Sequence, residues 1–253
     1  MVKYFLRDVR TAVKEKYSLY YIIGMLVLCV LANLSMICFR KFYGLNDGSF
    51  GENLIIFAEG AFIIPYYSTI VIAHIIFGRD YPDPHIKDST TIKMHRWQLY
   101  IGKLLGEICL AAIFFVAAVV LFFGVTIIFQ IGAGTIDWWT LGDFMYKAFV
   151  ALPLWIAGLS IGNMCLFLME KKKNAYITFF VIVLVIPRLI MLLASDAVRL
   201  GFCKFIAENL LITPQFTALQ FFFTMDPIKC LILGIVYTVI SCAIGIAAFY
   251  KRK

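Results

Sequence analysis

Two charged side chains, Glu59 and Arg188, lie inside long apolar stretches of the sequence. Ionisable groups at such depth bind ions, move protons or line a transport path, because burying a charge without a function is costly. Each lies six residues from one end of its stretch, which is a depth of about 9 Å in a membrane-spanning helix. Equal depth permits an ion pair between them. The alternative for Arg188 is that its long side chain extends to the lipid headgroups.

The other polar residues do not form a catalytic set. An intramembrane hydrolase needs paired acids with histidines, or a Gly-x-Ser-x-Gly turn with a histidine, at one depth. The three histidines, His74, His85 and His95, lie near or in one connection, whereas Glu59 is at the opposite end of its stretch. We therefore predict no catalytic residue and no cofactor in this chain.

The seven cysteines show no Cys-x-x-Cys spacing and no histidine at metal-ligand spacing. Most of them lie in apolar stretches, where cysteine is a small apolar residue. We therefore predict no metal site. Only Cys203 and Cys230 are placed where a disulfide could form.

The composition indicates a membrane protein that crosses the bilayer several times. Of the 253 residues, 62% are hydrophobic and only 15% are charged, against about 45–50% and 25% in soluble domains. We expect an all-α fold, a single transmembrane domain over 1–253, because six stretches are long enough to cross a hydrocarbon core of about 30 Å. These are residues 19–38, 53–77, 104–131, 148–169, 175–194 and 228–250. The connections have no room for a soluble ATPase or DNA-binding domain.

The distribution of the 23 lysines and arginines predicts the orientation. Most lie in the N-terminal tail, in the second connection, at Lys171–Lys173 and at the C-terminal end, all on one side if six spans form. The positive-inside rule then places both termini in the cytoplasm of a multi-pass protein in the cell membrane. The basic residues are explained by the bilayer, and we expect no nucleic-acid partner. The first apolar run is too long for the core of a signal peptide, so we expect a retained span.

Two segments outside the spans have membrane character. Residues 1–16 place apolar side chains together on a helical wheel, which predicts an interfacial helix on the inner leaflet; the alternative is a basic tail. Residues 195–227 lie on the outer side, yet they are strongly apolar and divided by Pro214. We expect an outer re-entrant hairpin before the last span. A seventh span is the alternative, but it would place the C-terminal cations outside.

The second connection, 78–103, is the longest polar segment on the cytoplasmic side. Asp83 and Pro84 are suited to the N-cap and first position of a short helix. A short cytoplasmic helix between two spans can transmit force, because a partner that moves this helix also moves both spans.

The residues around this connection resemble those of the permease subunits of ABC-2 type transporters. The matching positions are Phe77, Asp80, Ile86, Lys87, Asp88, Arg96, Tyr100 and Lys103. They follow the family pattern of Phe-x-x-acid, then Ile-Lys-Asn or similar, then Arg-x-x-x-Tyr-x-x-Lys. The chain departs from this pattern with Asp80 in place of Glu and with Pro82, Asp83 and Pro84 in place of Gly-Thr.

The resemblance implies a division of labour between subunits. The permease pairs with a second permease copy, as a homodimer or a paralogous heterodimer, and with two ABC ATP-binding subunits that hold ATP and Mg²⁺. The sequence contains no Gly-x-x-x-x-Gly-Lys-Ser/Thr phosphate loop, so we expect that this chain is not an enzyme and that ATP hydrolysis belongs to the partner. The residues implied in coupling to the ATPase are Asp80, Asp83, Ile86, Lys87, Asp88 and Arg96. Since the second and fifth spans of the family line the path, Glu59 and Arg188 are implied in a gate.

Within the family, the chain looks most like bacterial exporters of bacteriocins, antimicrobial peptides and amphipathic toxins, and like the immunity permeases. The expected function is ATP-driven export of amphipathic or antimicrobial peptides. Export of drugs or lipids is the near alternative, and an ATP-independent secondary transporter or channel is the more distant one. For His74 and Glu107, near the cytoplasmic ends of their spans, we expect interfacial positions, with a proton relay as the alternative.

Overall fold

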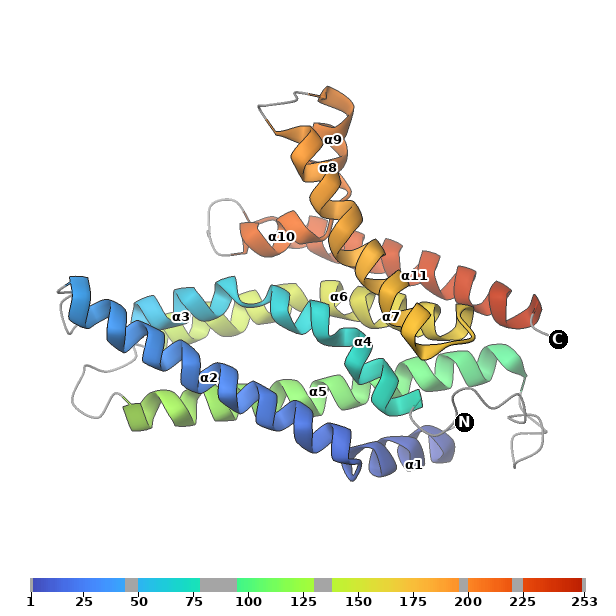
Figure 1. Cartoon of the computed structure of the whole chain (residues 1–253), viewed down its shortest axis with the longest axis horizontal. Coiled ribbons are helices and arrows are strands. Elements are labelled where there is room, and N and C mark those ends of the chain that lie inside the picture. The colour runs from blue at the N-terminus through green and yellow to red at the C-terminus, as the bar shows by residue number, and fades with distance from the viewer. Residues whose placement is uncertain are drawn as a thin grey trace.

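The computed structural model describes residues 2–43, 50–77, 95–129, 138–195, 200–219 and 225–251. These residues form helices joined by short turns, and no strand occurs among them, so the predicted all-α class is confirmed (Figure 1). The helices are α1 (Val2–Val13), α2 (Lys16–Tyr43), α3 (Phe50–Gly60), α4 (Ile63–Phe77), α5 (Arg96–Phe129), α6 (Trp138–Leu168), α7 (Lys172–Phe180), the π-helical η3 (Val181–Val185), α8 (Ile186–Ala194), α9 (Gly201–Asn209), α10 (Thr213–Ala218) and α11 (Pro227–Lys251).

Five helical segments of the described residues are long and apolar enough to cross a membrane, and the bent pair α3–α4 makes a sixth. They are α2, α5, α6, the continuous α7–η3–α8 segment and α11. The chain is therefore a helical membrane protein with five to six candidate spans. In Figure 1, α1 and the end of α11 lie towards the same end of the bundle, as do the end of α4 and the start of α5.

The break between α3 and α4 bends the second candidate span by 51°. Pro65 explains its position, because proline has no backbone N–H to donate to Ala61 and its ring crowds the preceding turn. A neighbouring helix satisfies part of the exposed backbone, since the indole N–H of Trp155 donates to the Phe62 carbonyl oxygen at 2.9 Å. The bend is thus held by α6.

Helix α6 is the centre of the bundle. In its most apolar stretch 72% of the residues are buried, against 6% in α2. Its most extensive contact is with α11, where Gly234 allows the backbones to approach closely: an added Cβ would lie 2.6 Å from the carbonyl carbon and oxygen of Pro153. Small residues permit this kind of close helix packing in membranes.

The segment α7–η3–α8 leaves the bundle at a steep angle (Figure 1). The π turn Val181–Val185 ends two residues before Pro187, which cannot donate the usual helical hydrogen bond. Beyond it, Leu189 and Leu192 are exposed. In the segment expected to re-enter, α9 and α10 are nine and six residues long, and neither is long enough to cross a membrane.

The N-terminal helix α1 forms as expected, but part of its apolar face packs on protein. Val9 and Ala12 are buried against α4 and α5. A turn at Lys14 and Glu15 separates α1 from α2, and Ser18 Oγ donates to the Ala12 carbonyl oxygen at 2.6 Å across it. The position of α1 is therefore tied to that of α5.

Candidate functional site

Most residues implied in coupling lie outside the part of the chain that the structure describes. These are Asp80, Asp83, Ile86, Lys87 and Asp88, and the short helix expected from Pro84 lies there too. Arg96 is the first residue of α5. The structure does describe the residues on the two flanks of this connection, which are the end of α4 and the start of α5.

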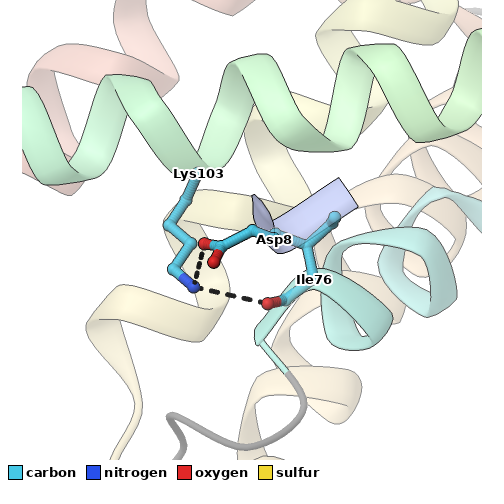
Figure 2. Close-up of polar contacts among 3 residues, drawn as sticks. All are labelled: Asp8, Ile76 and Lys103. Atoms are coloured by element: carbon cyan, nitrogen blue, oxygen red, sulfur yellow. Dashed lines mark hydrogen bonds and ion pairs between the residues drawn. The ribbon is translucent and has the colours of Figure 1, made fainter. Parts of the chain in front are cut away.

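A lysine joins three helices at these flanks. Lys103 of α5, with 3% of its side chain exposed, donates from Nζ to Asp8 Oδ2 of α1 at 2.9 Å and to the Ile76 carbonyl oxygen of α4 at 3.4 Å (Figure 2). The last carbonyls of a helix have no partner within it and favour a nearby cation. Lys103 thus fastens the end of α4 and α1 to the beginning of α5.

Residues from both flanks of the connection also share one aromatic cluster. The ring of Phe77 lies 4.9 Å from that of Phe167 on α6, and the ring of Tyr100 lies 4.7 Å from it on another side. Lys103 Nζ lies 5.7 Å from the centroid of Phe77. Phe77, Tyr100 and Lys103 are three of the matching positions named above. Tyr100 and Lys103 were expected within the connection at 78–103, but α5 begins at Arg96 and both residues lie on that helix, where they come together with Phe77 of α4. We call these three residues with Asp8, Ile76 and Phe167 the flank junction.

The flank junction gives a testable expectation for α1. In Asp8→Asn the buried ammonium of Lys103 loses its carboxylate, so α1 should open more often and the amides of Val2–Val13 should exchange hydrogen faster, while those of α6 stay protected. Hydrogen–deuterium exchange of the purified protein measures this. The control is Glu208→Gln, which alters an exposed carboxyl on α9. Unchanged exchange in α1 would show that the ion pair does not hold that helix.

Glu59 is paired inside the bundle, but its partner is Lys147. Lys147 Nζ lies 2.7 Å from Glu59 Oε2 and 2.7 Å from Asp143 Oδ2. The Glu59 and Lys147 side chains are 2% and 5% exposed, whereas that of Asp143 is 29% exposed. Two carboxylates around one ammonium give the group a net negative charge. Its exposed part is the Asp143 side chain. This triad connects α3 to α6 just before the break in the second span.

Arg188 does not take part in that pair. Its side chain is exposed on α8, and among the described residues Glu59 has its ion pair with Lys147 instead. The physical reason is the arrangement of helices: α3 packs on α6, whereas α8 leaves the bundle towards α9 (Figure 1). Of the two alternatives for Arg188, the structure therefore favours a side chain that extends outwards.

Lys147 and Asp143 are site residues that the sequence reasoning missed. We expected the fourth span at 148–169, which left Lys147 in the preceding connection, but α6 begins at Trp138. Their spacing of four residues was a usable signal, because an acid and a base at i and i+4 face one another on a helix. Asp8 had no comparable signal, since its partner is 95 positions away.

Glu107 is buried within the bundle. It is fully inaccessible in the first half of α5 and lies near Tyr100 and Cys242. His74 is only partly buried and lies between the rings of Tyr17 and Tyr176, at 5.9 and 5.7 Å. All seven cysteines lie in the described ranges and are free thiols, so the possible disulfide between Cys203 and Cys230 is not formed. Cys230 is instead buried in the core of the bundle.

Comparison with known proteins gives no relative from which a function could be transferred. No protein-family model matches the chain, and no curated protein matches it. The function is therefore inferred from the chain's own residues: the flank junction, the triad and the buried groups of α5 and α6.

Proposed function

We propose that the chain is the membrane-spanning permease subunit of an ATP-driven ABC exporter of amphipathic, antimicrobial peptides. The observation that carries this proposal is the flank junction. Phe77, Tyr100 and Lys103 match the ABC-2 pattern in sequence. In space, Phe77 and Tyr100 both contact Phe167, and Lys103 lies over the ring of Phe77. A push on the connection between α4 and α5 would therefore act on α1, α4, α5 and α6 together.

In this proposal the energy comes from partner subunits. Two ATP-binding subunits hold ATP and Mg²⁺ and contact the coupling residues of the second connection, with Lys171–Lys173 as a smaller contact. A second copy of the permease completes the path, both termini lie in the cytoplasm, and the assembly resides in a bacterial cell membrane. Exposed apolar side chains along α2, α5 and α8 are compatible with lipid and with a second permease.

Two features support an amphipathic peptide as cargo. The exposed rings of Phe202 and Phe205 offer an apolar surface on α9, which packs on α8. The triad of Glu59, Asp143 and Lys147 adds a polar station with excess negative charge at the level of the α3–α4 break. A peptide with cationic and apolar faces has groups that match both. Glu59 is the gate residue in this proposal, and Arg188 faces the headgroups.

The test is reconstitution with the partner. The tagged chain is purified from its native membrane, the co-purifying ATPase is identified by mass spectrometry, and both are placed in vesicles with an amphipathic cationic peptide. We expect ATP-dependent peptide transport and peptide-stimulated ATP hydrolysis, because the chain itself has no phosphate loop. An ATPase partner that lacks its phosphate-loop lysine is the control. Transport by the chain alone, without any ATPase, would contradict the proposal and favour a secondary transporter.

A further inference from the structure

Glu107 has an unusual environment for a carboxyl group. It lies on α5 with no exposed surface, and both of its carboxylate oxygens are buried without a hydrogen-bond partner among the described residues. Buried polar atoms are nearly always hydrogen-bonded, so two orphaned oxygens on one side chain call for an explanation. Neither the flank junction nor the triad uses this residue.

The surroundings of Glu107 are polar and come from three helices. Tyr100 of α5 lies beside both Glu107 and Asn163 of α6, and its hydroxyl donates to the Ser241 carbonyl oxygen of α11 at 3.4 Å. Cys242 of α11 lies beside both Glu107 and Ser160 of α6. Ser160 and Asn163 are themselves fully buried. We call these residues of α5, α6 and α11 the Glu107 cluster.

The charges around the cluster do not balance an ionised carboxylate. The nearest cation is Lys103, one helical turn earlier on α5, and it already pairs with Asp8 at 2.9 Å. Lys103 and Asp8 together have no net charge, so an ionised Glu107 would leave one uncompensated negative charge inside the bundle. Such a charge is strongly unfavourable at membrane depth. The cluster therefore requires one positive charge.

We propose that the Glu107 cluster is a proton-binding site. One proton from the aqueous phase forms an O–H bond on the Glu107 carboxyl, which makes the group neutral, and the same proton returns to water when α5, α6 and α11 separate. A metal ion is a poorer occupant, because hard cations need about six oxygen ligands. No group of three or more acidic, histidine or cysteine residues suited to a metal occurs among the described residues. This site goes beyond the proposed export function, since ATP-driven export requires no bound proton.

The other titratable groups near the cluster are few. Tyr100 and Lys103 lie on α5, Cys242 on α11, Cys165 on α6 beside Tyr100, and Asp8 on α1 behind Lys103. In water, cysteine, tyrosine and lysine lose their protons only above about pH 8. Near the cluster, Glu107 is therefore the group proposed to take up a proton on folding between pH 5 and pH 8. Glu59 and His74 lie elsewhere in the bundle, so the contribution of Glu107 is measured as the difference between wild type and a Glu107 variant.

The test measures how the unfolding equilibrium depends on pH. Wild type, Glu107→Gln and Asp8→Asn are unfolded in mixed micelles at several values between pH 5 and pH 8, with sodium or choline as the salt cation. If Glu107 holds one proton in the folded protein and releases it on unfolding, the unfolding constant of wild type rises with pH about tenfold more per unit than that of Glu107→Gln. This added slope is by definition absent from Glu107→Gln, which carries an uncharged amide. It should become smaller in Asp8→Asn, because that variant removes the carboxylate that neutralises Lys103 and so lets Lys103 balance an ionised Glu107. The control is again Glu208→Gln.

Two results would overturn the proposal. One is a pH slope that Glu107→Gln leaves unchanged; the other is stabilisation by sodium over choline at constant pH, which would assign the site to a metal cation. A second measurement does not depend on folding of the variant. Infrared spectra of wild type at pH 7–8 should contain the carbonyl band of a protonated carboxylic acid inaccessible to solvent. Absence of that band would also refute a bound proton. None of these results depends on an ATPase partner, so they leave the export proposal to its own test.

Discussion

Replacing Lys147 with methionine should lower the free energy of unfolding by about 3–5 kcal/mol, the usual effect of removing one member of a buried ion pair. Methionine keeps the apolar length of the side chain but leaves Glu59, which is 2% exposed, without its ammonium at 2.7 Å. The loss comes from the uncompensated carboxylate rather than from packing. The measurement is equilibrium unfolding of the purified protein in mixed micelles, followed by circular dichroism.

A double variant separates these two causes. Adding Glu59→Gln to Lys147→Met removes the unpaired charge, so the pair should recover most of the lost stability, and the two substitutions should be strongly non-additive. Lys204→Met is the matched control, because the Lys204 side chain is 66% exposed and its Nζ is as far as 4.0 Å from Glu208 Oε1. This substitution should change the free energy of unfolding by less than about 1 kcal/mol. Additive losses, or a Lys147→Met protein as stable as wild type, would show that the triad is not a coupled unit.

Replacing Gly234 with alanine is expected to separate α11 from α6 and to lower stability by about 1–3 kcal/mol, the range for overpacking a core. The new Cβ would lie 2.6 Å from backbone atoms of Pro153, and backbone cannot rotate away as a side-chain end can. Because α6 and α11 share the most extensive helix contact, the effect should reach the whole bundle. The unfolding assay used for Lys147 measures it.

Gly24→Ala is the matched control for that substitution. Gly24 lies on α2, and nothing lies within 4 Å of the position that its Cβ would occupy. Alanine has the higher helix propensity, by about 1 kcal/mol in a soluble helix, so this variant should equal or slightly exceed wild type. If both glycine variants behaved alike, close contact between α6 and α11 would not explain the role of Gly234.

Hydrophobic length alone predicted the class of the fold. Stretches of about 20 apolar residues must become helices in a bilayer, because every backbone polar group needs a partner within the chain. The helix ends were less predictable. Helix α6 begins ten residues before the expected start at 148, because polar residues such as Asp143 and Lys147 can lie in a helix when they pair with one another. The 51° break was signalled only by Pro65.

The pairing of charged groups could not be predicted from depth. Glu59 and Arg188 are at matching depth, but an ion pair also requires that the two helices face each other, and helix order around the bundle is not encoded in hydropathy. Lys147 was available on the adjacent helix and is the partner. Glu107 shows the same limit: its distance from the span end suggested the interface, whereas packing between α6 and α11 removes it from water. In both cases tertiary neighbours decide the environment.

The central position of α6 has a consequence for biosynthesis. The chain is made from its N-terminus, so α3, α4 and α5 enter the bilayer before α6, on which they pack. They must remain stable in lipid on their own apolar character, and α2 retains a largely lipid-exposed surface in the finished protein. Helix α6 arrives later, carrying Lys147, and meets Glu59 already in place. A charge that would be costly on a solitary helix in the bilayer is thus introduced when its partner is already present, and α11 then packs against α6.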